Sequence, residues 1–273
     1  MVYKEKFSYR KVAELLVTVA FYGVVIYLIR AAIQGQTVQF LGLIKSAVPY
    51  FFGSYWFIKT YLILYLLAPF LNKGLIRLDI NGYRRLLLTQ ILLFSVWYSV
   101  GLSAPLIDDG YGIINFVTLY LIGGYIRRFS DECAVLRWFN SLRSFFAYLI
   151  CVLMTAFVSI FINPFGYAFC TSIFASAFLF LAFQKLPERE TKWINTLSSK
   201  AFDVFFVHGA WIFNLLGIQA VAASWLVAPH MILTLVICYL IGFISGCIRS
   251  VVMKATVDKL LDKWDAMNKS FTV

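Results

Sequence analysis

Long apolar runs alternate with short polar segments along the whole chain. Eight of these runs have the length that a membrane-spanning helix needs, because about 20 residues at a rise of about 1.5 Å cover a hydrocarbon core of roughly 30 Å. They lie at residues 12–33, 54–72, 84–102, 111–126, 143–162, 166–186, 200–218 and 229–250. The pattern predicts an all-α polytopic membrane protein with about eight transmembrane helices.

The run at 54–72, SYWFIKTYLILYLLAPFLN, begins with aromatic residues and then becomes almost purely apolar. Tyr55 and Trp56 stand where an interfacial aromatic belt is expected. Lys59 follows about one turn inside the span, where a cation either snorkels outward to the interface or faces a polar cavity. Both interpretations of Lys59 remain open on the sequence.

Two further segments are amphipathic rather than uniformly apolar. In 37–52 the apolar positions recur every three or four residues with polar residues between them. This rhythm predicts a helix that lies flat on the membrane surface. The segment 129–142 has a similar stripe and is expected to do the same on the other side.

Composition excludes a soluble globule. The chain is 62% hydrophobic and 14% charged, with a mean hydropathy of +0.82. Polar residues are too few to cover such a chain in water. The five cysteines are scattered without C-x-x-C or Cys/His spacing, so the sequence predicts neither a disulfide framework nor a metal site.

Basic residues are distributed unevenly between the two predicted faces. The chain has 24 Lys and Arg, and all but Arg30, Lys45 and Lys59 fall in the two terminal segments or in the loops after the second, fourth and sixth runs. Positively charged loops stay in the cytoplasm, so both termini are predicted to be cytoplasmic and the protein to lie in the cell membrane. Because the +11 charge is explained by this topology, we expect no nucleic-acid partner.

Ionisable residues inside predicted spans are the candidates for catalysis, because burying them without a partner is costly. Asp203 and His208 both fall in the run 200–218. They are five residues apart, which places them about 140° apart around a helix, so any partner must come from another helix. His208 is either a catalytic group or a neutral core histidine. Lys59 is the third weak candidate.

A polar ligand on the outer face is the alternative to a plain solvated turn for Asp108 and Asp109. They are the acidic residues that the topology places outside, just before Gly110, and a turn explains such residues equally well. Aromatic side chains that could stack on sugar rings are also present. These candidates are Tyr55, Trp56, Tyr61, Tyr98 and Trp211.

Three passages together resemble the membrane-bound acyltransferase-three family, whose members O-acetylate surface polysaccharides and exopolysaccharides of bacteria. They are YWFIKTYLILYLLAPFLNKGL at 55–75, FVTLYLIGGYIRRF at 116–129, and SSKAFDVFFVHGAWI at 198–212. The resemblance covers nearly the whole chain. It implies ten helices, acetyl-CoA as a cytoplasmic donor substrate without a bound cofactor, and a polysaccharide or lipid-linked glycan as acceptor.

The chain departs from the family pattern at its start. Members typically open with two further helices, the first of which carries an arginine and a histidine taken as essential, whereas this chain has no histidine before His208. Arg10 and Lys11 occupy the place of the basic cluster that usually follows the second helix. We therefore expect residues 1–273 to form a single domain that is N-terminally truncated relative to the family. Either the true start lies upstream, or this copy has lost its catalytic helix and is inactive.

The leading hypothesis is a membrane O-acyltransferase that moves an acetyl group to a sugar hydroxyl. The alternative is a non-enzymatic transport or assembly protein for polysaccharide export, although a transporter would show an internal repeat or paired broken helices, which the sequence lacks. The expected partners are the lipid bilayer, acyl-CoA and the glycan. The predicted donor site consists of cytoplasmic cations that can bind phosphates: Arg10, Lys11, Arg84, Arg85, Arg127 and Arg128.

Overall fold

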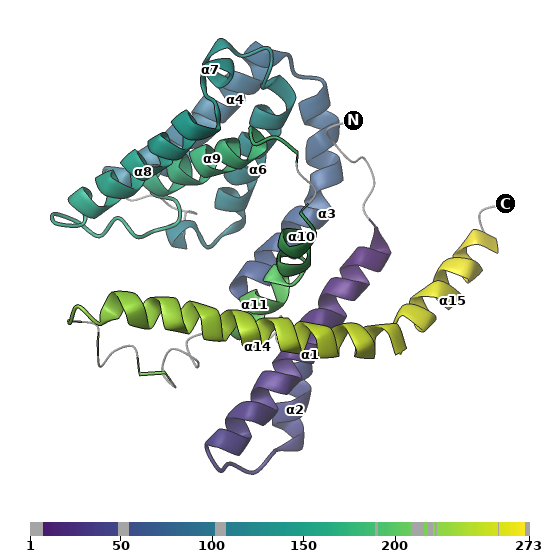
Figure 1. Cartoon of the computed structure of the whole chain (residues 1–273). Coiled ribbons are helices and arrows are strands. Elements are labelled where there is room, and N and C mark those ends of the chain that lie inside the picture. The colour runs from purple at the N-terminus through teal and green to yellow at the C-terminus, as the bar shows by residue number, and fades with distance from the viewer. Residues whose placement is uncertain are drawn as a thin grey trace. The chain divides into compact units, whose positions relative to one another are not determined.

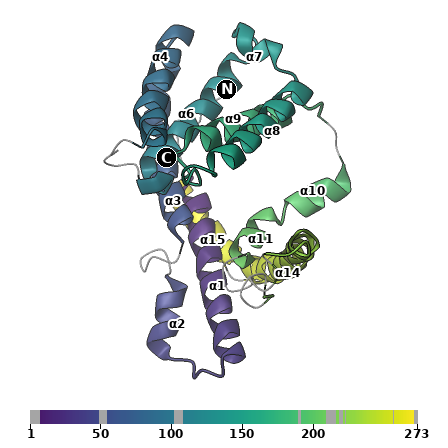
Figure 2. The same cartoon turned by 90° about the vertical axis from the view of Figure 1, so that its left-hand side faces the viewer.

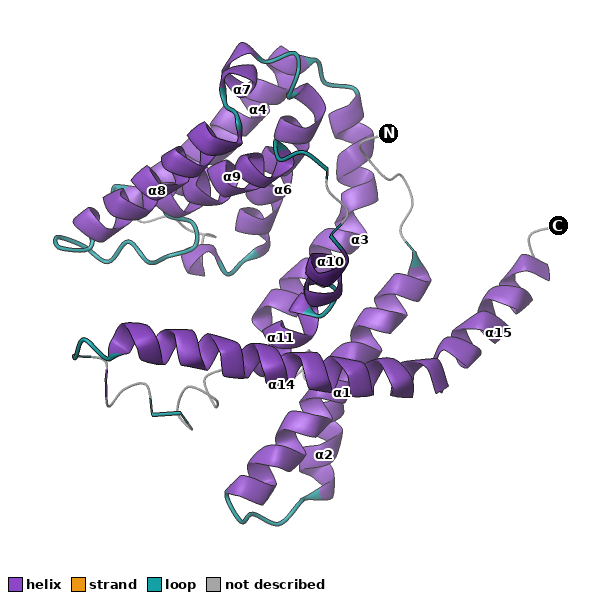
Figure 3. Cartoon of the chain, in the orientation of Figure 1, coloured by secondary structure: helices purple, strands orange, loops and turns teal. Residues whose placement is uncertain are grey.

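Every regular element in the described part of the chain is a helix, as predicted (Figure 3). The chain folds into two compact units. Unit 1 consists of Met1–Ser8 and Gly53–Glu188, and unit 2 of Tyr9–Phe52 and Arg189–Val273. The computed structural model describes residues 8–48, 55–101, 108–188, 191–208, 216–217, 221, 223–255 and 257–270. The single domain predicted for residues 1–273 stays a prediction.

Unit 1 is built around α6, which packs against α3, α4 and α9, while α8 lies along α9 (Figure 2). A π-helical segment, η1, joins α4 to α5, and a short 3-10 helix, η2, precedes α6. The bounds are α3 (Trp56–Ile76), α4 (Ile80–Ile91), η1 (Leu92–Val96), α5 (Trp97–Ser99), η2 (Asp108–Gly110), α6 (Ile113–Phe129), α7 (Ala134–Trp138), α8 (Ser141–Val158) and α9 (Cys170–Gln184).

The core of unit 1 gathers large side chains on one face of α6. Tyr125 and Phe129 of α6 contact Tyr83 of α4, with ring centroids 5.6 and 5.7 Å from that of Tyr83. The buried Tyr83 hydroxyl donates to the carbonyl of Leu121 at 3.1 Å. Burying a tyrosine with its hydroxyl satisfied retains the apolar gain without a desolvation penalty. These contacts fix α4 against the last two turns of α6.

Unit 2 contains the two longest helices of the described chain. In it, α2 folds back beside α1, and α11 packs along α14 (Figure 1). The amide of Gln39 donates to the Tyr27 hydroxyl at 3.0 Å, which ties the start of α2 to α1. The bounds are α1 (Tyr9–Ile33), α2 (Phe40–Ala47), α10 (Lys192–Ser198), α11 (Ala201–Val207), α14 (Val227–Ala255) and α15 (Val257–Ser270).

Three helical stretches of the described chain are long and apolar enough to cross a membrane: Tyr9–Ile33, Ser141–Val158 and Val227–Lys263. Their apolar side chains are largely exposed in the protein alone; Leu153 of α8 and Leu235 of α14 are examples. Such surfaces need lipid rather than water around them. The protein is therefore an all-helical membrane protein, while the count of eight spans and the cytoplasmic placement of both termini stay predictions.

Two predicted spans are shorter in the structure. For the run 166–186, the helix α9 begins only at Cys170. The residues before it form a loop that is hydrogen-bonded to the loop before α6, because the amide of Tyr167 donates to the carbonyl of Asp109 at 2.8 Å. For the run 200–218, α11 ends at Val207 and His208 is its C-cap. His208, which the apolar run places inside a spanning helix, therefore lies at the end of a helix. Residues 209–215, which include the candidate Trp211, lie outside the described residues.

Other boundaries differ because local hydrogen bonds, rather than hydropathy, set them. The helix predicted at 84–102 begins at Ile80, since the Asp79 side chain accepts from the amide of Gly82 at 2.9 Å and caps it. In the predicted surface helix 37–52, α2 has no buried residue. In the segment 129–142 only the short helix α7 forms before α8 begins. The pattern of apolar runs does not predict α10 and α15.

Candidate functional site

Unit 1 carries a cluster of three aromatic rings at the start of α3. The ring centroid of Trp56 lies 4.5 Å from that of Tyr111 and 5.4 Å from that of Tyr167. Tyr111 and Tyr167 meet edge to face at 5.1 Å. Trp56 is half-buried, while Tyr111 and Tyr167 are 40% and 49% exposed. The three rings therefore form an aromatic surface that is partly accessible.

Two carboxylates adjoin these rings. Asp108 and Asp109 are exposed and immediately precede the turn that leads to Tyr111. The hydroxyl of Tyr98 donates to Oδ1 of Asp109 at 2.7 Å. Both aspartates adopt left-handed backbone conformations, with φ of 45° and 47°, which few residues other than glycine adopt. Such conformations persist only where the surrounding structure enforces them. We call Trp56, Tyr98, Asp108, Asp109, Tyr111 and Tyr167 the aromatic–acidic cluster.

Two glycines allow the loops of the aromatic–acidic cluster to interlock. Gly110 has a φ of +88°, and a Cβ there would lie 2.7 Å from the carbonyl carbon of Tyr167. A Cβ at Gly166 would overlap the hydroxyl of Tyr98. The carbonyl of Gly110 is in turn held by the Asn115 side-chain amide at 2.9 Å. The sequence thus fixes the two loops against each other, so the rings and carboxylates keep a defined arrangement.

The other predicted site residues at the start of α3 lie outside the aromatic–acidic cluster. Tyr55 is the half-buried N-cap of α3. Tyr61 is exposed and its ring stacks on that of Phe57 at 6.3 Å on its own helix. Lys59 is half-buried in the first turn of α3, three residues after Trp56. The structure therefore brings together Trp56 and the two aspartates, and adds the rings of Tyr98, Tyr111 and Tyr167.

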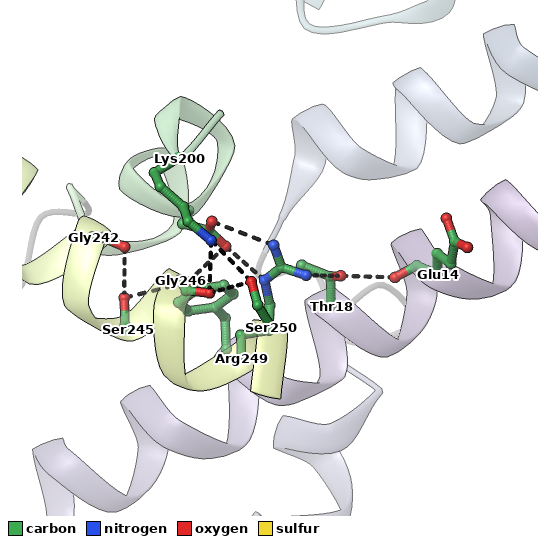
Figure 4. A network of polar contacts seen from close by, with 10 residues as sticks. Glu14, Thr18, Lys200, Gly242, Ser245, Gly246, Arg249 and Ser250 are labelled. Atoms are coloured by element: carbon green, nitrogen blue, oxygen red, sulfur yellow. Dashed lines mark hydrogen bonds and ion pairs between the residues drawn. The ribbon is translucent and has the colours of Figure 1, made fainter. Parts of the chain in front are cut away.

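Unit 2 contains a buried ion pair (Figure 4). Asp203 of α11 is 0% exposed, and its carboxylate is bound through both oxygens by Arg249 of α14. Nε of Arg249 lies 2.6 Å from Oδ1, and Nη2 lies 3.3 Å from Oδ2. The hydroxyl of Tyr22 on α1 donates to Oδ1 at 2.9 Å. As expected from helix geometry, the partners of Asp203 come from other helices.

Two glycines on α14 make this ion pair possible. Gly242 and Gly246 have the G-x-x-x-G spacing that lets membrane helices approach closely. A Cβ at Gly242 would lie 2.6 Å from Cα of Val204, and one at Gly246 would overlap Oδ2 of Asp203. The backbones of α11 and α14 therefore touch, and the carboxylate fills the space left by Gly246.

A second cation completes the network around Asp203. Nζ of Lys200 donates to the carbonyl of Gly246 at 3.1 Å and to Oγ of Ser250 at 2.9 Å. The ring of Tyr22 stacks on that of Phe206 at 4.7 Å and 5°. Both oxygens of the buried Asp203 carboxylate therefore accept hydrogen bonds, as buried polar groups require. We call Tyr22, Lys200, Asp203, Gly246, Arg249 and Ser250 the ion-pair network.

His208 caps the C-terminal end of α11, whereas Lys200 of the ion-pair network lies at its N-terminal end. It is exposed, and its ring centroid is 5.4 Å from that of Phe205. Asp203 is enclosed and bound through both oxygens, whereas the imidazole of His208 is accessible. Of the two candidates on α11, His208 is therefore the one that a substrate can reach.

The predicted donor-binding cations fall into separate groups. In unit 1, Nε of Arg84 lies 3.4 Å from the hydroxyl of Tyr125, and Arg85 follows it on α4. Nη1 of Arg128 donates to the carbonyl of Leu75 at 2.7 Å. Arg127 is exposed and lines a trough toward α9.

In unit 2, Arg10 is engaged by two carboxylates. Its Nε lies 3.0 Å from Glu14, and its Nη1 lies 2.6 Å from Asp262 of α15. Lys11 is exposed beside it. The structure thus places Arg84, Arg85 and Arg128 at one end of the α4–α6 pair, and Arg10 and Lys11 in the other unit.

Sequence reasoning missed Tyr22, Lys200 and Arg249 as site residues. Lys200 and Arg249 lie in segments whose basic residues indicate topology, and Tyr22 is 181 residues from Asp203. The G-x-x-x-G spacing, with Arg249 three residues after Gly246, is the signal that would have pointed to close helix packing here. Nothing in the sequence alone pairs Tyr167 with Trp56.

Comparison with known families agrees with this architecture. The model of an acyltransferase domain, that of acyltransferase family 3, matches residues 4–244. Neither the curated proteins nor the solved structures give a match. The family match covers most of the chain and reaches both units. Together with helices that can cross a bilayer, it shows that the chain belongs to acyltransferase family 3 and is a membrane acyltransferase.

Proposed function

We propose that this membrane acyltransferase moves an acetyl group from acetyl-CoA to a hydroxyl of a polysaccharide or lipid-linked glycan. The observation that carries the sugar acceptor is the aromatic–acidic cluster. Aromatic faces such as those of Trp56 and Tyr167 accommodate the C–H face of a pyranose ring, and the exposed carboxylates of Asp108 and Asp109 accept hydrogen bonds from its hydroxyls. The topology predicted from the basic loops puts this cluster on the outer face of the cell membrane, where surface glycans are found.

The transfer step exchanges a thioester for an oxygen ester. The acceptor hydroxyl oxygen attacks the carbonyl carbon of the thioester, the new C–O bond forms and the C–S bond breaks. The hydroxyl proton passes to the imidazole of His208, and the departing thiolate of CoA takes it up. His208 suits the role of general base because it is exposed and an imidazole accepts a proton at neutral pH.

Asp203 has a different role in this proposal. Both of its oxygens are engaged by Arg249, and Oδ1 also accepts from Tyr22, so it has no capacity left for a substrate proton. It is a positioning residue. By anchoring α11 to α14 and α1, it holds His208, five residues further along, in place.

The donor's phosphates are assigned to arginines of unit 1. Arg84 and Arg85 are exposed near the start of α4, and Arg128 lies at the end of α6, which packs against α4. Guanidinium groups bind phosphates through charge-assisted and often bidentate hydrogen bonds. Arg128 already donates to the carbonyls of Leu75 and Ile76, so Arg84 and Arg85 provide the main contacts.

Transfer from labelled donor tests this proposal. Purified protein in lipid vesicles would be incubated with acetyl-CoA that carries label in the acetyl group and with a bacterial surface glycan. We expect label in the glycan that mild alkali removes, because oxygen esters are alkali-labile and amides are not. Label that resists alkali would contradict O-acylation. Binding of acetyl-CoA without any transfer to the glycan would favour a non-enzymatic assembly protein.

A further inference from the structure

A trough of about 430 Å³ runs between α6 and α9 in unit 1. Its walls are mostly apolar and include Leu119, Ile122 and Phe180. On α6 it extends from Leu119 to Arg127, which corresponds to about 12 Å along the helix axis. The volume falls within the range of ligand pockets, roughly 300 to 1,000 Å³.

Small residues on both helices create this trough. Gly123 and Gly124 of α6 face Ser176 and Ala177 of α9 across it. A Cβ built at Gly123 would have no atom within 4 Å. The hollow is therefore open space beside the helix rather than a close backbone contact of the kind made by Gly246.

Arg127 stands at one end of the trough. It is exposed, and among the described residues no hydrogen bond or ion pair engages its guanidinium group. Its neighbour Arg128 points to the other side of α6, where it donates to the carbonyls of Leu75 and Ile76. Among the described residues that line the mostly apolar trough, Arg127 is thus the one cation.

An apolar trough with one cation fits a lipid with an alkyl chain better than it fits an acyl-CoA. The pantetheine arm of an acyl-CoA carries two amides that need hydrogen-bonding partners, and the trough offers few. The Ser176 hydroxyl already donates to the carbonyl of Ser172 at 2.8 Å, and that of Tyr120 to Asn72 at 2.7 Å. An alkyl chain needs no such partners.

We propose that the trough binds an anionic phospholipid, with its phosphate on Arg127 and an acyl chain along Gly123 toward Leu119. In the predicted orientation Arg127 lies at the cytoplasmic interface, where basic pockets between helices bind lipid headgroups. This site goes beyond the proposed acetyl transfer and does not depend on it.

Lipid retention by purified protein tests the proposal. Delipidated protein would be equilibrated with equal amounts of phosphatidylglycerol and phosphatidylcholine of the same chain length, and the retained lipids counted by native mass spectrometry. We expect the wild type to prefer phosphatidylglycerol and Arg127→Gln to lose about fivefold of that preference, as about 1 kcal/mol per interfacial cation implies. Arg127→Lys should keep it. Arg137→Gln, the same change at an exposed arginine of α7 outside the trough, is the matched control.

A second variant tests the apolar part of the trough. Gly123→Leu fills open space and should lower retention of both lipids without lowering the melting temperature. Equal lipid preference in Arg127→Gln and Arg137→Gln would overturn the proposal, as would displacement of phosphatidylglycerol by CoA at micromolar concentration. Lipid retention is read without acetyl transfer, so failure here leaves the proposed function standing.

Discussion

Gly246 of α14 lies so close to Asp203 of α11 that a Cβ on the glycine would overlap the carboxylate oxygen Oδ2. The same carboxylate binds Arg249, which is three residues further along α14. Close approach and ion pairing therefore depend on each other. Without the glycine the carboxylate would be displaced, and without the carboxylate Arg249 would be left half-buried without its counter-charge.

Gly246→Ala is expected to destabilise the protein. Overpacking of a tight contact costs typically about 1–3 kcal/mol, and the displaced carboxylate adds to it. Gly74→Ala is the control, because a Cβ at Gly74 of α3 meets nothing within 4 Å, and alanine is the better helix residue by about 0.5–1 kcal/mol. Thermal melting of the purified variants measures the change in stability for both substitutions. Equal melting temperatures for the two would show that the close contact does not form.

Breaking the ion pair from one side is expected to cost more than removing both partners. Asp203→Asn leaves the Arg249 charge uncompensated, and loss of one partner of a buried pair typically costs about 3–5 kcal/mol. The double variant Asp203→Asn with Arg249→Gln removes both charges and should be less destabilised than the sum of the single variants. A double-mutant cycle from denaturant unfolding gives the coupling. Additive effects would mean that the two side chains do not interact.

The aromatic–acidic cluster is expected to act on the acceptor and not on the donor. Trp56→Ala or Tyr167→Ala removes a stacking surface worth about 0.5–1.5 kcal/mol, which corresponds to about a 2- to 12-fold rise in KM for the glycan. The KM for acetyl-CoA should stay unchanged. Tyr61→Ala, which removes an exposed aromatic ring of the same helix away from the cluster, is the control. A rise in the KM for acetyl-CoA instead would place the donor here.

The distribution of basic residues predicts which loops are accessible from each side. Single cysteines introduced at Ile80, Val135 and Lys192 should react only with reagent on the cytoplasmic side. Those at Lys45, Asp108 and Asn163 should react from outside. Labelling of position 135 from outside would rule out the eight-helix arrangement.

The fold could be predicted where hydropathy alone determines it. The helices α1 and α14 appear within a few residues of their predicted runs, because long apolar segments have no other stable state in a membrane. The early end of α11 and the π-helical turn at Leu92–Val96 were not predicted. Hydrogen bonds and contacts specific to the folded chain set these features, and the apolar pattern does not reveal such contacts.

The candidate site could also be predicted only in part. Trp56, Asp108, Asp109, Asp203 and His208 could be named as candidates, because an aromatic, acidic or ionisable residue in a predicted span or outer loop is unusual in itself. Their partners could not. Arg249 lies 46 residues after Asp203, and the loop of Tyr167 meets that of Asp109 only through tertiary contact.

Acetylation of surface glycan in cells tests the central claim most directly. A bacterial strain that lacks the activity would produce the wild-type chain, His208→Ala or His208→Gln, and O-acetyl groups on the isolated glycan would be counted by NMR against the amount of folded protein in the membrane. We predict an O-acetyl signal with the wild type and its loss in both variants at equal protein level, because His208 is exposed and a single hydrogen bond in a membrane bundle contributes only about 0.6–2 kcal/mol to stability. No O-acetyl signal from the folded wild type, or acetylation that simply follows protein level in both variants, would contradict the account.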